Sequence, residues 1–177
     1  MKKSNILIIT GGTGGHVIPA LNFFKYLKNE SKNVFLLTDK RGHSYIKNID
    51  NTKIFKIQSS HLSGNIYFKF IAIIKLIIGF FQSLIIFIKI KPKTIISFGS
   101  YASVTPLICF FFLSYFFKIK LYIHEQNSII GRANKFFSKF SKKIFVNFDK
   151  EYSSIYKYKN KILVVGLPQK DIKNYST

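Results

Sequence analysis

The sequence is short of the residues that build disulfides and metal centres. Its one cysteine, Cys109, lies in the apolar run of residues 107–112. A disulfide framework and a thiolate metal cluster are therefore excluded, and a reducing cytoplasm is the expected compartment. The four histidines, at positions 16, 43, 61 and 124, do not show the ligand spacing of a histidine zinc site. We expect neither a metal nor a cofactor.

Acidic residues are also scarce. The 177 residues include 7 acidic and 28 basic ones, a formal net charge of +21, which favours a polyanionic partner such as nucleic acid or an anionic membrane. The lysines are spread along the chain rather than clustered, so we assign most of them to solvated faces. Hydrophobic residues make up 47% of the chain, which excludes intrinsic disorder, and the length fits one domain.

Three kinds of segment are not found. There is no internal repeat, no linker rich in Ser, Gly or Pro before residue 166, and no apolar N-terminal segment with a cleavage site. A signal peptide is therefore not expected. The polar residues 169–177 read as the start of a linker. We predict a domain over residues 1–165 and an interdomain linker that begins in residues 166–177.

Strand-like and helix-like patterns alternate along the chain. Continuous apolar runs predict strands, and apolar residues at helical spacing predict helices. The predicted strands cover residues 5–10, 33–38, 53–57, 94–98, 121–124, 143–147 and 162–165, and the predicted helices cover residues 16–29, 66–90, 103–117, 132–140 and 150–156. Strands separated by helices indicate right-handed crossovers, so we predict a Rossmann-like α/β fold with a parallel sheet covered on both faces.

The strongest local motif is a glycine loop, Gly-Gly-Thr-Gly-Gly-His at residues 11–16, between the first strand and the first helix. Glycines let backbone N–H groups approach a ligand, and the helix adds its positive end, which suits a diphosphate or a charged transition state. The loop lacks the Lys-Ser/Thr pair of nucleotide kinases and the third glycine of the dinucleotide fingerprint. Asp39 stands where a ribose-binding acid would lie, which keeps a dinucleotide site open as an alternative. We favour the interpretation that Asp39 is a turn residue.

Polar residues also follow two later strands. Two motifs, Ser97-Phe-Gly-Ser-Tyr-Ala-Ser103 and His124-Glu-Gln-Asn-Ser128, begin at the carboxyl end of a predicted strand. Ligands bind beyond the carboxyl ends of parallel strands, so the three turns are expected to meet there. Glu125 fits loop organisation and function equally, whereas Asn127 is favoured as a ligand contact. The positive helix end favours neutral imidazole, so His16 is a candidate general base, with helix capping as the alternative.

These motifs resemble the MurG family of N-acetylglucosaminyltransferases, which convert lipid I to lipid II in peptidoglycan synthesis and so serve cell-wall biogenesis, cell shape and division. The resemblance rests on GGTGGHVIP at residues 11–19, on Gly99-Ser-Tyr, and on HEQN at residues 124–127 with Gly131 and Asn134. It implies the N-terminal half of a metal-independent GT-B fold. The donor-binding C-terminal half is then missing and has to be supplied in cis or in trans.

The resemblance also implies roles for individual residues. Thr13, Gly14, Gly15 and Asn127 would bind UDP-GlcNAc, and His16 would be the base or a transition-state stabiliser. Gly99, Ser100, Tyr101, Glu125, Gln126 and Asn134 would bind the acceptor or organise its loops. Two positions depart from the family: Lys170 replaces an arginine, so a bidentate contact becomes a point charge, and Ser100 replaces a glycine.

Residues 70–88 form an apolar stretch with one charge, Lys75, almost long enough to span a bilayer. Flanking lysines and a position between two strands favour an amphipathic crossover helix that lies on an anionic membrane. We therefore expect a peripheral enzyme on the cytoplasmic face of the inner membrane, rather than a spanning one. The alternative partner for this helix is the missing half or an oligomer.

Three alternatives to a complete transferase remain, the first implied by the resemblance and the other two by the residues themselves. The chain is the membrane-associated half of a split GT-B enzyme, or a basic nucleic-acid-binding module, or a nicotinamide-dependent enzyme. The nucleic-acid alternative requires exposed aromatics interleaved with lysines, whereas the aromatics fall mostly in apolar patterns, so no nucleic-acid partner is expected. The nicotinamide alternative rests on Asp39 and an incomplete fingerprint.

Overall fold

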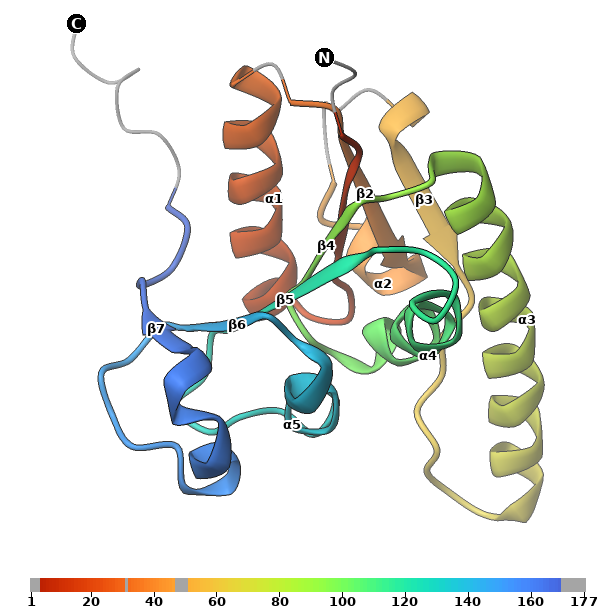
Figure 1. Ribbon diagram of the computed structural model, residues 1–177. Coiled ribbons are helices and arrows are strands. Elements are labelled where there is room, and N and C mark those ends of the chain that lie inside the picture. The colour runs from red at the N-terminus through yellow and green to blue at the C-terminus, as the bar shows by residue number, and fades with distance from the viewer. Residues whose placement is uncertain (1–3, 31, 47–50, 170–177) are drawn as a thin grey trace, which may run out of the picture.

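The computed structural model describes residues 4–30, 32–46 and 51–169 and centres on one parallel sheet. Seven strands are ordered β3-β2-β1-β4-β5-β6-β7 (Figure 1). Their bounds are β1 Ile6–Ile9, β2 Val34–Asp39, β3 Ile54–Ile57, β4 Thr94–Ser97, β5 Lys120–Glu125, β6 Lys143–Val146 and β7 Ile162–Val164. The order reverses between β1 and β4, which is the switch point where ligands bind in such sheets. The fold class is confirmed.

Helices cover both faces of the sheet. The α-helices are α1 Gly14–Asn29, α2 Lys40–His43, α3 Ile66–Ile90, α4 Val104–Leu113 and α5 Arg132–Phe137, and the 3₁₀ turns are η1 Asn51–Lys53, η2 Tyr101–Ser103, η3 Ser138–Phe140 and η4 Ser153–Lys161. Alternate residues of β1 enter different cores: Ile8 packs with α1, whereas Leu7 and Ile9 pack with α3, α4 and α5. A strand buried on both faces explains its unbroken apolar run.

Four predicted helices differ from the structure, among them the one over residues 132–140, where α5 ends at Phe137 and the 3₁₀ turn η3 follows. The first begins at Gly14 rather than at residue 16, and the one over residues 103–117 starts after η2 and ends at Leu113. The hydroxyl of Ser114 donates to the carbonyl of Phe111, and this local bond competes with further helix. The helix predicted over residues 150–156 is wrong. A 3₁₀ segment, Ser153–Lys161, stands there, interrupted by non-helical backbone at Ile155 and Tyr158.

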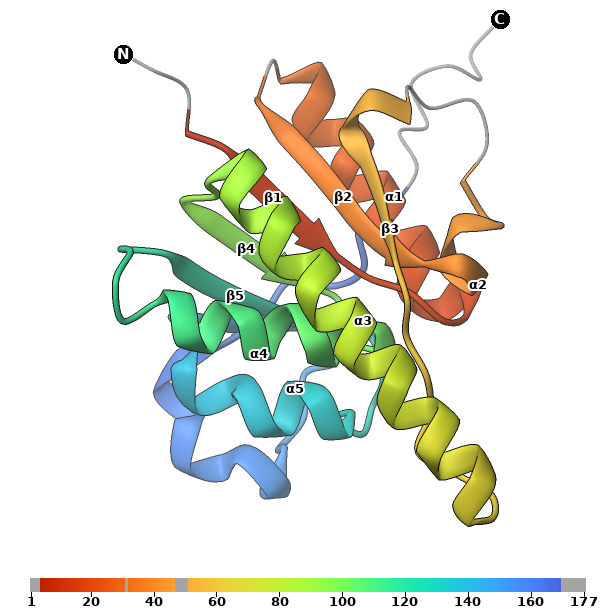
Figure 2. The ribbon, with the colours of Figure 1, turned by 90° about the vertical axis from the view of Figure 1, so that its right-hand side faces the viewer.

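The long helix α3 leaves much of its apolar surface uncovered. It is long and apolar enough to cross a membrane by length and composition, yet 28% of its most apolar window is buried against the domain. Its N-terminal end projects past the sheet, on the side to which the strands point (Figure 1, Figure 2). The exposed residues of α3 include Ile66, Tyr67, Phe70, Ile74, Ile77 and Phe81. Phe112 at the end of α4 and Tyr115 and Phe116 in the turn after it are also exposed.

Candidate functional site

The three turns that follow β1, β4 and β5 enclose one cavity of about 440 Å³ at the carboxyl edge of the sheet. It is lined by Gly12, Thr13, His16, Arg41, His61, Gly99, Ser100, Tyr101, Val104, Asn127, Gly131, Arg132, Ala133 and Asn134. The same pocket therefore contains Thr13, His16 and Asn127, although Thr13 and Asn127 lie more than 100 positions apart in the sequence. The expected convergence of the three turns is confirmed, while the roles of the residues stay predictions.

The glycine loop packs directly against the turn after β4. A Cβ atom at Gly11 would lie 2.4 Å from the Cβ of Ala102, so only glycine permits this approach. Thr13 caps α1 without a side-chain hydrogen bond in the described chain. The N–H groups of Gly14 and Gly15, in the first turn of α1, are thus available to a ligand.

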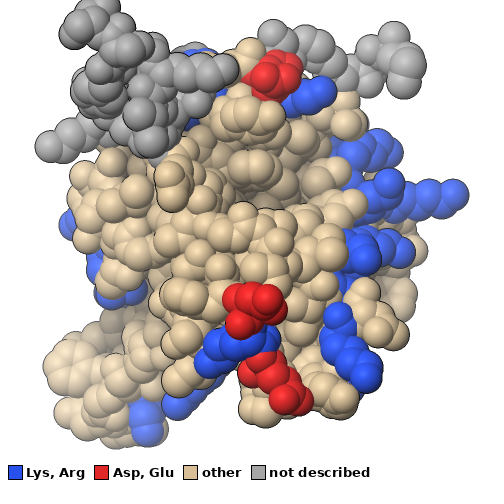
Figure 3. All heavy atoms as spheres, turned by 90° about the vertical axis from the view of Figure 1, so that its left-hand side faces the viewer, with Lys and Arg blue, Asp and Glu red and all other residues tan. Residues whose placement is uncertain are grey.

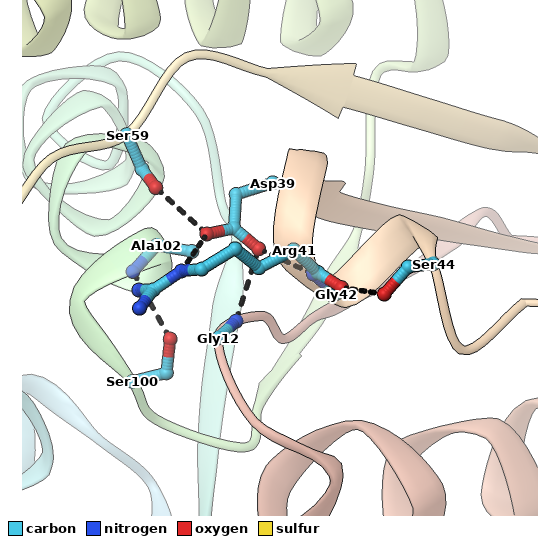
Figure 4. Close-up of polar contacts among 8 residues, drawn as sticks. All are labelled: Gly12, Asp39, Arg41, Gly42, Ser44, Ser59, Ser100 and Ala102. Carbon is cyan, nitrogen blue, oxygen red and sulfur yellow. Dashed lines mark hydrogen bonds and ion pairs between the residues drawn. The ribbon is translucent and has the colours of Figure 1, made fainter.

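Asp39 joins the glycine loop to α2 (Figure 4). Its Oδ1 accepts hydrogen bonds from the N–H of Gly12 at 2.9 Å and of Gly42 at 2.8 Å, and its Oδ2 accepts from the hydroxyl of Ser59 at 2.9 Å. The Arg41 guanidinium lies 3.6 Å away. Burial by itself raises the pKa of Asp39, but these hydrogen bonds and Arg41 outweigh burial and lower it. Both oxygens are occupied, which agrees with the turn role rather than with ribose binding.

The turn after β4 adopts a backbone that normally requires glycine. Ser100 has φ 79° and ψ 164°, a region that L-residues rarely enter. Its Oγ accepts a hydrogen bond from the N–H of Ala102 at 3.1 Å, which helps to hold that conformation. The serine therefore keeps the glycine-like path of this loop. Beside it, Tyr101 packs edge-on against His61 with the ring centroids 4.1 Å apart.

Glu125 organises the turn after β5. Its Oε1 accepts from the N–H and the side-chain amide of Asn127, both at 3.0 Å. Its Oε2 accepts from the N–H of Gly131 and the side-chain amide of Asn134, both at 2.9 Å. The carboxylate is fully buried, with four donors around two oxygens. This geometry supports loop organisation for Glu125 and Asn134, and it orients Asn127 at the cavity.

The turn after β5 also holds the imidazole ring of His16. Its Nδ1 lies 2.6 Å from Oε1 of Gln126, and the Gln126 amide contacts both the carbonyl oxygen and Nδ1 of His124. The other ring nitrogen of His124, Nε2, lies 3.0 Å from the carbonyl of Gly166. Burial lowers the pKa of His124, although Gly166 and Glu125 oppose the shift.

The remaining predicted residues that the structure describes fall into three groups. Gly99, Ser100, Tyr101 and Asn134 line the cavity, whereas Glu125 and Gln126 lie beneath it and support it. Gly14 and Gly15 form the first turn of α1 beside it. Lys170 lies outside the described residues. Among the lining residues with charged or titratable side chains, Arg41, His61 and Arg132 were not predicted from the sequence.

One signal in the sequence does point to the arginines. Of the 28 basic residues only two are arginine, Arg41 and Arg132, and both line this cavity. Arginine binds phosphate oxygens in a bidentate manner, which lysine cannot do. In a chain that uses lysine almost everywhere else, its use at these two positions indicates an anionic ligand.

A larger cavity, of about 570 Å³, lies between α1 and the segment of residues 165–169. Apolar side chains dominate its lining, including Phe23, Ile96 and Phe145. On the molecular face turned to the viewer in Figure 3, most Lys and Arg lie toward the margins, acidic and basic side chains lie together below the middle, and the surface above them is uncharged. None of the predicted site residues that the structure describes lines this second cavity. In the described part of the chain, no three His, Cys, Asp or Glu residues form a group suited to a metal ion.

Comparisons with known proteins place the chain in a family. Residues 6–146 match the glycosyltransferase family 28 N-terminal domain. The protein named UDP-N-acetylglucosamine–N-acetylmuramyl-(pentapeptide) pyrophosphoryl-undecaprenol N-acetylglucosamine transferase is 37% identical over 98% of this chain in Rickettsia canadensis, and 36% identical over 94% in Rickettsia rickettsii. These matches cover 47% and 42% of the two relatives, so the chain spans less than half of their length.

A solved structure, that of Acinetobacter baumannii MurG, superposes with a TM-score of 0.68 and 25% identity, over 84% of this chain and 42% of that one. The resemblance inferred from the motifs is thereby confirmed, and the fold is that of the N-terminal half of a GT-B glycosyltransferase. The chain belongs to glycosyltransferase family 28, of which it contains the N-terminal domain.

Proposed function

We propose that this domain binds the lipid-linked acceptor and contributes the base in the transfer of N-acetylglucosamine from UDP-GlcNAc to lipid I. The observation that carries the proposal is the shared cavity of Thr13, His16 and Asn127 at the switch point of a family 28 domain. In a single inverting displacement, the C4 hydroxyl of the muramyl sugar attacks the anomeric carbon. The bond from that carbon to the UDP oxygen breaks, and its electron pair leaves with UDP.

His16 takes the hydroxyl proton in this proposal. Its Nδ1 is occupied by Gln126, which leaves Nε2 as the nitrogen that accepts the proton. The N–H groups of Gly14 and Gly15 and the positive end of α1 stabilise negative charge on the departing diphosphate. Asn127 contacts the donor sugar, and Lys170, by its match to the family arginine, supplies a positive point charge.

Arg41 and Arg132 bind the diphosphate of the acceptor. They reach the cavity from two different elements, α2 and the start of α5. Arg41 is anchored by Asp39 yet keeps 63% of its side chain exposed, so its remaining N–H groups can bind an anion. The loop carrying Gly99, Ser100 and Tyr101 lines the same cavity as the two arginines and completes the acceptor site.

A second domain completes the cleft, because one Rossmann-like half supplies only one wall of a GT-B site. The curated relatives are more than twice as long as their matched part. We propose that residues 1–165 form the acceptor domain, that the linker begins in residues 166–177, and that the donor domain is supplied in cis or in trans. The split-enzyme alternative corresponds to the second arrangement.

The uncovered face of α3 and the end of α4 contacts the cytoplasmic leaflet of the inner membrane. Phe70, Ile74 and Ile77 are exposed, and Lys69 and Lys75 add positive charge among them. Apolar side chains with adjacent lysines favour the interface of an anionic bilayer. Because α3 projects on the side of the carboxyl edge, this contact holds the cavity next to the membrane that carries a lipid-linked acceptor (Figure 2).

Complementation tests the reaction. The chain is combined with a family 28 C-terminal domain, and UDP release is measured with a lipid I analogue. Replacement of His16 by asparagine lowers kcat by roughly 10²–10⁴-fold, the usual contribution of general base catalysis. His43→Asn is the matched control, since His43 lies outside the cavity lining, and keeps the turnover of the unmodified chain. Absence of turnover with a folded partner, or equal loss in both variants, contradicts the proposal.

Vesicle flotation tests the membrane contact. The chain is expected to float with vesicles that contain anionic lipid, and the double variant Phe70→Asp, Ile77→Asp to stay in the soluble fraction. Tyr156→Asp is the control, because Tyr156 is exposed on η4, away from α3. Flotation of the double variant at the level of the control contradicts the assignment of this face.

A further inference from the structure

We infer that Gln126 and His124 are positioning residues that fix the proton of His16 on Nδ1, and that a hydrogen-bond chain extends this control to the carbonyl of Gly166. The inference rests on the proposed function of His16, but the protonation pattern itself is a property of this chain alone. It follows from donors and acceptors whose identities leave one consistent assignment.

The first step is the orientation of the Gln126 amide. One of its terminal atoms lies 2.9 Å from the backbone carbonyl oxygen of His124, which can only accept a hydrogen bond. That terminal atom is therefore the nitrogen, and the other one, facing His16, is the oxygen. Since Oε1 only accepts, Nδ1 of His16 has to donate across the 2.6 Å contact.

The second step is the protonation of His124. Its Nε2 lies 3.0 Å from the carbonyl oxygen of Gly166, so this nitrogen carries the proton and donates. A neutral ring then has a bare Nδ1, which accepts from the Gln126 amide at 3.1 Å. Burial lowers the pKa of His124 and keeps the ring neutral, as this role requires. Phe98 stacks on the ring with centroids 4.9 Å apart and fixes its plane.

The chain of bonds has a direct consequence for His16. A neutral imidazole with its proton on Nδ1 has a lone pair on Nε2, which faces away from Gln126. Free imidazole side chains in water favour the opposite form, with the proton on Nε2. Gln126 therefore holds His16 in the less common form, the one in which Nε2 acts as a base. The backbone at Gln126 is tied in turn to Asn147, whose side-chain amide donates to the backbone carbonyl of Gln126 at 3.2 Å.

The far end of the chain of bonds lies where the polypeptide leaves the sheet. Gly166 lies two residues after the end of β7, and the neighbouring segment is tied to α1 by a hydrogen bond from the side-chain amide of Asn22 to the carbonyl of Pro168 at 3.0 Å. His124 lines the larger cavity, and His16 lines the smaller one. Gln126 lies between the rings of His16 and His124 and contacts both. The backbone carbonyl of Gly166 therefore contributes to the protonation pattern in the candidate site.

Nitrogen NMR of the chain with ¹⁵N-labelled histidine tests the inference, because protonated and bare ring nitrogens resonate in separate ranges. His16 is expected to carry its proton on Nδ1, and Gln126→Leu to shift it to Nε2. His124→Phe keeps the aromatic stack and the backbone carbonyl, so it is expected to shift His16 only in part. Gln58→Leu, at an exposed glutamine away from the cavity, is the matched control and leaves His16 unchanged.

The spectra test the protonation of His16, and the kinetics test its proposed role as the base. A proton on Nε2 of His16 in the unmodified chain, or one that stays on Nδ1 in Gln126→Leu, overturns the inference. If Gln126→Leu does not fold, the unmodified chain and His124→Phe decide it. In the complemented enzyme, Gln126→Leu is expected to lower kcat about tenfold with the donor KM unchanged. An unchanged kcat in Gln126→Leu refutes the positioning role of Gln126. Absence of turnover in the complemented, unmodified enzyme refutes only the proposed function.

Discussion

Removal of the Asp39 carboxylate is expected to uncouple the glycine loop from α2. In Asp39→Ala, the N–H groups of Gly12 and Gly42 lose their shared acceptor in a region that is 3% exposed at Asp39. Each unpaired buried N–H costs about 1–3 kcal/mol, so we expect a loss of about 3 kcal/mol in the free energy of unfolding. Asp39→Asn keeps one acceptor oxygen for both groups and is expected to lose about 1 kcal/mol.

Urea unfolding followed by circular dichroism measures both losses, with the exposed Asp149→Asn as a control within about 0.5 kcal/mol of the unmodified chain. Because the folded-state pKa of Asp39 is lowered, its ionised form stabilises the fold above the ordinary Asp pKa of about 3.9. The difference in the free energy of unfolding between the unmodified chain and Asp39→Asn is therefore constant at neutral pH. It vanishes as the pH falls through the folded-state pKa of Asp39. A loss below about 1 kcal/mol in Asp39→Ala refutes the assigned role.

Three further substitutions probe the other turns. Ser100→Gly relieves a strained backbone at the expense of the bond to Ala102, so it is expected to stabilise the fold by up to about 1 kcal/mol in urea unfolding; clear destabilisation contradicts the strain. Glu125→Gln turns an amide toward buried donors and is expected to cost about 2 kcal/mol in the same assay, whereas a proton-transfer role predicts lost turnover with unchanged stability. Arg132→Lys is expected to raise the acceptor KM of the complemented enzyme about tenfold with little change in kcat, because a bidentate contact becomes monodentate; an unchanged KM removes Arg132 from the acceptor site.

The sequence was sufficient for the parts of the fold that depend on local pattern. Apolar runs predicted the strands. The rule that parallel strands share a carboxyl edge predicted that the loops around Thr13, Ser100 and Asn127 lie together. It was not sufficient where the outcome depends on packing between distant segments. Arg41 reaches the cavity because α2 is a single helical turn capped by Asp39, and such a short helix has no apolar periodicity to recognise.

The contact between His16 and Gln126 illustrates the same limit at the site itself, because these residues are 110 positions apart. The motif HEQN indicated four polar side chains at a strand end and favoured Asn127 as the ligand contact, but it did not show that Glu125 and Gln126 hold the loops together. The division between ligand contact and loop residue depends on which side chain is left exposed. Glu125 and Gln126 are buried and engaged by neighbours, whereas Asn127 is exposed at the cavity.

The two buried carboxylates of the described chain explain why the base in our proposal is an imidazole. Asp39 and Glu125 both lie at the carboxyl edge, where a catalytic acid or base would be expected. Each oxygen of both side chains already accepts a hydrogen bond or faces a cation, and protonation would break the turns that form the cavity. A carboxylate committed to the loops in this way cannot take up a proton in each catalytic cycle without a structural penalty. His16 has one nitrogen engaged and one free, so it can accept a proton while the loops keep their hydrogen bonds.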